Sequence, residues 1–273
     1  MQTKLEVLIC TYGKDGISRV GRMRLPTVDG VRYLVSWQPA GCDTSAIPSD
    51  LRRDDVSVVI ADSIGSSNNR NNAVDHATAP VCLMADDDLR YTPDGLLAVI
   101  DTFENNPDLD VASFRYSGDD NKQYPSAETD LTNDWPKNFY CASFEIAFRR
   151  EAVAGRIFYN PYFGINAPRL MNGEDSVFIL DCRNAGLNCR FFPITITHHA
   201  GLTTGLRNID DSRVAMGEGA YIRYCYGWKG FPRVPLFVWR RFRSGKIKFL
   251  WGLLHVTKGF LYTVPKNAKT ISN

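Results

Sequence analysis

Short apolar runs alternate with helical segments through the first half of the chain, and this alternation constrains the fold more than any other feature. Near-continuous apolar strands are typical of a parallel sheet that is buried on both faces, with helices as the crossover connections. We therefore expect an α/β fold with a mostly parallel central sheet. The expected strands are Leu5–Cys10, Val31–Trp37, Val56–Ala61, Val81–Ala85, Asp110–Tyr116 and Phe191–Thr197, and Phe139–Arg149 also has a strand-like pattern.

The expected helices are placed by signals at their ends. Thr92 is a capping residue, Pro93 suits a first helical turn, and Gly186 follows a helical stretch that opens at Asp175. We expect helices over about 69–77, 92–104 and 175–185. The stretch Ser117–Lys137 is polar and has no period. Unstructured stretches of this length inside a compact domain are usually functional or mobile.

The charge distribution divides the 273 residues into two parts. Residues 219–273 contain 11 Lys and Arg and no Asp or Glu, whereas residues 1–218 contain 21 basic and 30 acidic residues. We therefore expect a main domain at 1–218 and a basic, aromatic segment at 219–273. The longest apolar run of this segment, Phe249–Val264, is shorter than the roughly 20 residues that span a bilayer. Two readings remain: a peripheral segment on an anionic membrane, or a helical subdomain packed on the main domain.

Two further features bear on location and partners. The seven cysteines include no Cys-x-x-Cys pair, and the first residues do not form a signal peptide. We therefore expect a cytoplasmic protein with reduced thiols, and the membrane reading of the basic segment places it at the inner face of the cell membrane. RNA binding is a weaker alternative because no RNA-binding motif is present, so we expect no nucleic-acid partner.

The acidic triplet Asp86-Asp87-Asp88 is the strongest candidate site. It directly follows the apolar strand Val81–Ala85, and ligands of open α/β sheets bind at the carboxyl ends of strands. Adjacent carboxylates repel one another unless a cation neutralises them, and Mg²⁺ and Mn²⁺ prefer such oxygen ligands. A solvated turn before the next helix is the alternative interpretation of a bare Asp triplet. Its position after a buried strand favours a cation site.

Three other motifs carry candidate chemistry. Glu174-Asp175 follows Asn-Gly and opens a helix, where acids are either caps or a general base. His198-His199 end a strand before a glycine-bearing loop, as structural residues or as a metal ligand. Arg70 lies near the start of a helix, where an arginine is either exposed or holds a diphosphate.

Taken in order, these motifs resemble the family 2 glycosyltransferases with the GT-A fold. The resemblance covers about residues 4–205 and rests on Cys-Thr-Tyr after the first strand, Ser-x-x-x-Arg-Asn, the Asp cluster, x-x-Pro-Asp-x-Leu, Gly-Glu-Asp and a late His. It implies an inverting transfer from a nucleotide-diphospho-sugar, in the first place a UDP-sugar, to a saccharide or lipid-linked saccharide. It also implies a divalent cation, Mn²⁺ or Mg²⁺, and a role in bacterial surface polysaccharide or glycolipid synthesis.

The resemblance also assigns roles to individual residues. Asp88 and His198 are the expected metal ligands, with His199 as the alternative to His198. Asp175 is the expected catalytic base, beside Glu174. Which residue reads the nucleobase stays open, because the second strand ends in Ser-Trp-Gln and the third in Ala-Asp-Ser. The residues expected to bind the donor are Thr11, Tyr12, Arg70, Asp86 and Asp87.

Two other functions compete with this interpretation. A sugar-phosphate nucleotidyltransferase should carry a glycine-rich segment with a basic residue after the first strand, and Cys10–Lys14 has only one glycine. A non-catalytic lipid- or glycan-binding protein on the same fold would have little need for both acidic motifs and the histidines. Product analysis separates the first alternative, and binding of UDP with Mn²⁺ tests the second.

Overall fold

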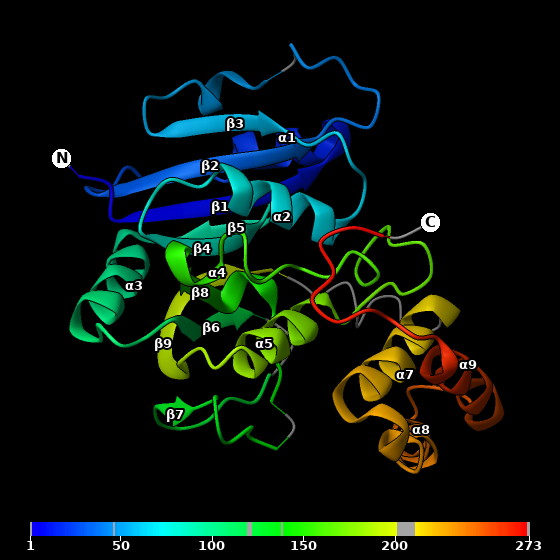
Figure 1. The fold of residues 1–273 in the computed structure, drawn as a ribbon. Coiled ribbons are helices and arrows are strands. Elements are labelled where there is room, and N and C mark those ends of the chain that lie inside the picture. Colours follow the sequence, from blue (N-terminus) through cyan, green and yellow to red (C-terminus); the bar gives the residue numbers. More distant parts are fainter. Residues whose placement is uncertain (1, 46, 119–121, 138, 201–210, 272–273) are drawn as a thin grey trace.

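The structure is a computed structural model that describes residues 2–45, 47–118, 122–137, 139–200 and 211–271. Within these residues, one nine-stranded sheet forms the centre of the molecule, with strand order β3-β2-β1-β4-β8-β6-β9-β5 and β7 paired to β9 (Figure 1). The strands are β1 (Leu5–Tyr12), β2 (Val31–Gln38), β3 (Val56–Ile60), β4 (Val81–Asp86), β5 (Leu89–Tyr91), β6 (Val111–Gly118), β7 (Thr129–Asp130), β8 (Ile146–Arg149) and β9 (Cys189–His199).

The sheet is parallel where the apolar runs predicted it to be. Strands β3, β2, β1 and β4 are parallel neighbours, and β6 is parallel to β9. The strand β8 is antiparallel to both β4 and β6, and β5 and β7 are antiparallel to β9. The α/β class and the mostly parallel sheet are therefore confirmed.

Helices cover both faces of the sheet, and each face has its own apolar core. On one face, α1 (Gly13–Arg22) and α3 (Pro93–Asn105) pack on Leu5, Val7 and Ile9 of β1. On the other, α2 (Ser66–His76), α4 (Arg150–Val153) and α5 (Glu174–Asn184) pack against a core that includes Leu8. Side chains of a strand alternate between faces, so consecutive residues of β1 enter different cores.

The expected elements differ from the observed ones in a few places. The helix α1 was not expected, because its sequence has few apolar residues and only Ile17 and Val20 are its buried large side chains. The strand-like stretch 139–149 contains a short 3₁₀ turn at Ser143–Glu145 and a strand only at Ile146–Arg149. All seven cysteines lie in described parts of the chain, and none forms a disulfide.

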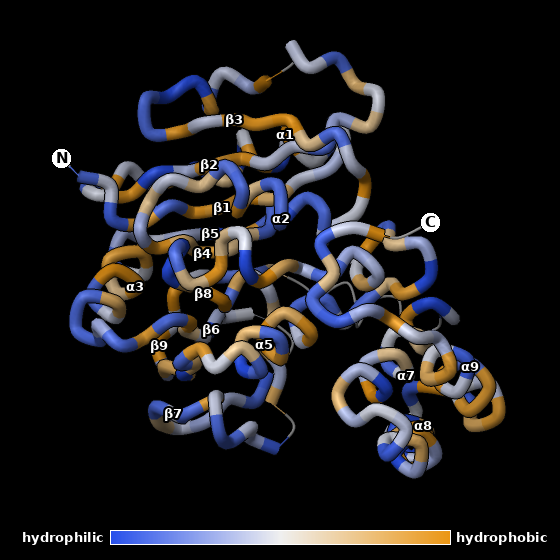
Figure 2. Tube along the Cα trace, viewed as in Figure 1, coloured by the Kyte–Doolittle hydropathy of each residue, from blue (hydrophilic) through white to orange (hydrophobic). Residues whose placement is uncertain are grey.

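The basic C-terminal segment folds into a helical unit beside the sheet (Figure 1). It consists of α7 (Ser212–Tyr226), the 3₁₀ turn η3 (Gly227–Gly230), α8 (Arg233–Arg243) and α9 (Phe249–Leu261). Figure 2 shows hydrophobic stretches along the helices of this unit, and Val234, Val238 and Phe260 are fully buried within it. The expected boundary between residues 218 and 219 falls inside α7, which begins at Ser212.

Glycines allow α7 and α9 to approach closely. A Cβ atom on Gly219 would lie 1.9 Å from the carbonyl oxygen of Val256, and one on Gly259 would lie 1.9 Å from that of Met216. Any larger residue would push the helices apart. Among the described residues, no helix is long and apolar enough to cross a membrane.

Candidate functional site

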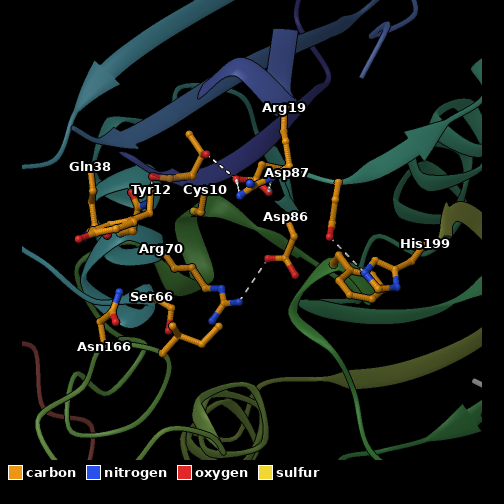
Figure 3. A pocket seen from close by; sticks show the side chains of 15 residues that line it. Cys10, Tyr12, Arg19, Gln38, Ser66, Arg70, Asp86, Asp87, Asn166 and His199 are labelled. Carbon is orange, nitrogen blue, oxygen red and sulfur yellow. Dashed lines mark hydrogen bonds and ion pairs between the residues drawn. The ribbon is translucent and has the colours of Figure 1, made fainter. Parts of the chain in front are cut away.

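A cavity of about 470 Å³ opens at the carboxyl ends of β1, β2 and β4 (Figure 3). This is the edge at which parallel α/β sheets bind ligands, and the volume suits a small organic ligand. The cavity brings together seven residues singled out in the sequence and eight that were not. The first group is Thr11, Tyr12, Arg70, Asp86, Asp87, Asp88 and His199, and the second is Cys10, Arg19, Gln38, Ser66, Asn69, Phe144, Ile165 and Asn166.

The middle acid of the triplet is held by the protein itself. Asp87 accepts a hydrogen bond of 2.5 Å from the hydroxyl of Thr11 and two of 2.9 Å from the guanidinium of Arg19 (Figure 3). Such bidentate arginine–carboxylate pairs fix geometry strongly. Gly16 lies against this network, because a Cβ there would be 2.2 Å from Thr11 Oγ1. Both carboxylate oxygens of Asp87 are therefore engaged within the fold.

Asp88 lies beside a histidine of β9. Its Oδ2 is 3.5 Å from Nε2 of His199, which is buried and lines the cavity. His198 points the opposite way, because consecutive strand residues alternate. It is exposed, and its Nδ1 is 3.0 Å from the hydroxyl of Ser117. Of the two histidines left open by the sequence, His199 is the one that faces Asp88.

Arg70 is buried between the two acidic motifs and contacts both of them. Its Nη2 lies 3.4 Å from Asp86 (Figure 3). Its Nη1 lies 2.9 Å from Glu174 and 3.4 Å from Asp175. Nη2 also donates a hydrogen bond of 2.7 Å to the hydroxyl of Ser143. The sequence places these acids 16 and more than 100 positions from Arg70, and only the fold brings them together.

The environment of Asp175 suits a proton acceptor. Burial raises the pKa of its carboxyl to about 8, and the nearby charges of Arg70 and Glu174 act in opposite directions on it. A carboxyl with a pKa close to neutrality is matched to general base catalysis. Neither Asp175 nor Glu174 is among the residues that line the cavity. Both lie directly behind Arg70, at the first turn of α5.

Gln38 and Tyr12 are partners at the ends of adjacent parallel strands, β2 and β1, and both line the cavity (Figure 3). The side-chain amide of Gln38 donates to the carbonyl oxygens of Ser63 and Gly65, the latter at 3.1 Å. It therefore ties the end of β2 to the loop that precedes α2. The ring of Tyr12 is 45% exposed, which leaves it accessible to a ligand.

The helical unit contacts the chain just before α5. Asn172 donates a 3.5 Å hydrogen bond to Glu218, which also accepts one of 3.3 Å from Arg241 of α8. The C-terminal strap that follows α9 returns to the main domain, where Asn267 accepts a hydrogen bond from the backbone of Phe158. Packing of residues 212–267 on the main domain is thus an observed feature.

Comparisons with known proteins bear on the family resemblance and on the fold. Residues 43–160 match the family described as Glycosyl transferase family 2, which confirms the resemblance seen in the motifs. No curated protein matches the chain. The fold is similar to the crystal structure of Staphylococcus aureus TarS 1–349, with a TM-score of 0.60 and 15% identity over 93% of this chain and 81% of that one.

Two further structures show the same likeness. TarS 1–349 in complex with UDP-GlcNAc aligns with a TM-score of 0.60 and 15% identity, over 96% of this chain and 82% of that one. A mycobacterial protein aligns with a TM-score of 0.55 and 12% identity, over 82% and 75% of the two chains. At these identities the likeness shows the fold, which is the expected GT-A fold.

Proposed function

This chain carries a family 2 glycosyltransferase region on a GT-A fold, and from that premise we propose that it transfers a sugar from a nucleotide-diphospho-sugar to an acceptor hydroxyl with inversion. The observation that carries the proposal is the convergence of both acidic motifs on Arg70 at the cavity. In this proposal one motif would receive the donor and the other would activate the acceptor.

The donor is proposed to occupy the cavity, with a UDP-sugar as the first candidate. TarS, which is similar in fold, is known in complex with UDP-GlcNAc and with UDP. Tyr12 offers an exposed ring on which a base can stack, next to Gln38. Of the residues assigned to donor binding, Asp87 and Thr11 would act by shaping the cavity wall, because they bind each other.

The residues present fit a divalent cation. Asp88 Oδ2 and His199 Nε2 are 3.5 Å apart, which is less than twice the metal–ligand distance of about 2.1 Å. The described residues contain no group of three or more His, Cys, Asp or Glu that could hold a metal. Mg²⁺ and Mn²⁺ commonly use one or two carboxylates plus substrate phosphates and water, so a pair suffices. A cation bound there supplies positive charge to the departing nucleoside diphosphate.

Asp175 is proposed as the base. Its carboxylate would take the proton from the acceptor hydroxyl as that oxygen forms a bond to the anomeric carbon. The bond between this carbon and the diphosphate breaks on the opposite face, which inverts the configuration. Arg70 keeps Asp175 in place through a 3.4 Å ion pair and offsets the negative charge of the three neighbouring acids.

Product analysis tests this function. Purified protein is incubated with UDP-, GDP- and dTDP-sugars, Mn²⁺ and a panel of glycan and lipid-linked acceptors, and the nucleotide products are separated by chromatography. The proposal predicts release of a nucleoside diphosphate together with a glycosylated acceptor. Asp175→Asn should keep donor binding and lose most transfer, whereas equal losses in both would contradict the base role.

The same assay addresses the competing functions. A sugar-phosphate nucleotidyltransferase would form a nucleotide-sugar and release pyrophosphate. A non-catalytic binding protein would retain a nucleotide or glycan without turnover. Both acidic motifs are assembled around one arginine, and this arrangement favours catalysis over either alternative.

The helical unit is proposed to rest on the inner, cytoplasmic face of an anionic membrane, where a lipid-linked saccharide would be the acceptor. The unit exposes Trp228 (63%) and Leu250 (79%), and its residues from 219 onward carry 11 basic and no acidic side chains. Exposed aromatic and aliphatic side chains among cations favour the interface of anionic lipids. This location suits the synthesis of bacterial surface polysaccharide or glycolipid.

Vesicle flotation tests the membrane contact. Vesicles of phosphatidylglycerol and phosphatidylcholine should bind the protein, and pure phosphatidylcholine vesicles should not. The double variant Arg240→Gln/Arg243→Gln removes two exposed charges of α8. At about 1 kcal/mol per charge near the surface, its binding should weaken roughly thirtyfold. Arg22→Gln/Arg52→Gln, with two exposed arginines of the main domain, is the matched control. Equal binding by both double variants would contradict the proposal.

A further inference from the structure

A lysine and a glutamate form a buried ion pair beside the cavity, and no part of the mechanism above uses them. The side chain of Lys122 is 2% exposed and that of Glu145 is 0% exposed, and the lysine ammonium contacts the Glu145 Oε2 atom. Lys122 belongs to the polar stretch 117–137, and Glu145 ends the short 3₁₀ turn Ser143–Glu145. The pair therefore joins that stretch to the turn.

The contacts of the pair hold both side chains in one geometry. Glu145 Oε1 accepts a 2.5 Å hydrogen bond from the hydroxyl of Tyr124, and Oε2 accepts one of 2.6 Å from the backbone N–H of Ala142. The Lys122 ammonium lies 4.1 Å from the ring centre of Tyr140 and 4.9 Å from that of Tyr124. Desolvated cation–π contacts of this kind add to the ion pair.

The turn that Glu145 holds carries two side chains into the site. Ser143 accepts the 2.7 Å hydrogen bond from Arg70, which contacts both acidic motifs. The ring of Phe144 is stacked on His199, with 5.3 Å between ring centres and 16° between planes. Phe144 also lines the cavity. Two consecutive residues of one turn thus hold the arginine and the histidine on which the proposed chemistry depends.

A second route reaches the same histidine. The ring of Tyr116 is 5.5 Å from the Lys122 ammonium and packs edge-on against Phe144 and His199, at 5.0 and 6.2 Å. Lys122 and Glu145 are therefore connected to His199 through two different aromatic side chains, Phe144 and Tyr116. Buried ion pairs add little net stability compared with apolar residues of similar size. We therefore expect the pair to act on the position of the turn and of His199, not on the stability of the fold.

We propose that Lys122 and Glu145 are a buried positioning pair, which fixes the 142–145 turn so that Ser143 holds Arg70 and Phe144 holds His199 at the cavity. The catalytic consequence rests on the glycosyltransferase function proposed above. Neither residue touches the cavity, so both act through their neighbours. An ordered site therefore also requires that residues 122–137 are in place.

The direct test is the NMR signal of the His199 ring in the full chain labelled at histidine. The chain has four histidines, so His199 is assigned by comparison with His199→Gln. Protons that lie over an aromatic ring are shifted upfield. Glu145→Gln removes the charge that fixes the turn, and the His199 ring signals should move downfield while those of His76 and His255 stay in place.

Glu6→Gln is the matched control. Glu6 is also buried and accepts hydrogen bonds of 2.6 and 3.1 Å from the backbone of Thr78 and Ala79. It lies before the middle of β1, whereas the cavity is at the carboxyl end of that strand. This variant should lose stability but keep the wild-type signal of His199. An unchanged His199 signal in folded Glu145→Gln, or an equal change in Glu6→Gln, would overturn the proposal.

Kinetics give the second readout. Glu145→Gln and Lys122→Met should each lower kcat at least tenfold, or about 1.4 kcal/mol in the activation barrier. Each single variant leaves one buried charge without its partner, whereas Lys122→Met/Glu145→Gln removes both. The double variant should therefore lose much less than the product of the two single losses, and multiplicative losses would overturn the proposal. If the wild type transfers no sugar, the proposed function fails, and the His199 signal still decides on the pair.

Discussion

Arg70→Met is the perturbation that tests the architecture of the site most sharply. Arg70 is 5% exposed and faces Glu174 at 2.9 Å and Asp175 and Asp86 at 3.4 Å each. Methionine is similar in length but has no charge, so three acids lose their shared counter-charge. Removing one partner of a buried ion pair costs about 3–5 kcal/mol. In a chain of this size that corresponds to a fall in Tm of roughly 6–20 °C.

The pH dependence of the stability of Arg70→Met identifies why the variant is less stable. The pKa of Asp175 is raised by burial and lowered by Arg70, so Arg70→Met should raise it further. Around pH 8 the folded variant then binds more protons than the folded wild type. The stability gap between them should therefore narrow as pH falls from 8 to 5, chiefly between about 8 and 7, because a carboxyl with a pKa of about 8 is already protonated below that range. Urea unfolding curves at several pH values, followed by tryptophan fluorescence, measure this gap.

Arg149→Met is the control for this experiment. Arg149 is partly buried, and its guanidinium donates to the backbone carbonyl oxygens of Leu109, Phe103 and Asn106 instead of to acids. The loss of unfolding free energy in Arg149→Met should be independent of pH between 5 and 8. A loss below about 1 kcal/mol for Arg70→Met, or one that does not change with pH, would refute the idea that Arg70 balances the three carboxylates.

Three further predictions concern single residues of the site. Burial raises the pKa of the proposed base Asp175 to about 8, so the rate of transfer should increase as pH rises towards 8. Asp175→Asn should lower kcat by roughly 10²–10⁴ and remove this pH dependence. A wild-type rate that falls as pH rises towards 8 would contradict the base role. Gly16→Ala places a methyl group 2.2 Å from the hydroxyl that binds Asp87. The free energy of unfolding, measured by urea unfolding, should therefore fall by about 1–3 kcal/mol. An unchanged free energy would show that the hydrogen bonds of Asp87 rearrange without cost. His199→Ala should abolish the effect of Mn²⁺ on nucleotide affinity in calorimetry, whereas His198→Ala should retain it, and the opposite result would return the ligand role to His198.

The sequence predicts the parts of this fold that depend on local pattern. The apolar runs around Leu5–Cys10 and Val81–Ala85 become buried parallel strands, and the Asp triplet lies at the carboxyl end of the latter. These predictions succeed because a buried strand needs consecutive apolar residues. The cavity edge follows from the topology of a parallel sheet.

Contacts between distant segments could not be predicted in this way. Arg19 lies on a helix with too few apolar residues to be recognised, and its contact with Asp87 joins positions 68 apart. The choice between His198 and His199 depends on which of two alternating residues faces the cavity, and a shift of one residue reverses it. Lys122 in a polar stretch resembles a solvated residue until Glu145 is placed beside it.

A thermal-shift titration tests whether a nucleotide-sugar binds this cavity with a cation held by Asp88. UDP-, GDP- and dTDP-sugars are each added with and without Mn²⁺ to the wild type and to Asp88→Ala. A ligand at 100 times its Kd adds about 2.7 kcal/mol of stability, or roughly 5–11 °C in Tm. We expect such a rise for one nucleotide, dependent on Mn²⁺ and lost in Asp88→Ala. An equal rise in the variant, or none with any donor in the wild type, would contradict it.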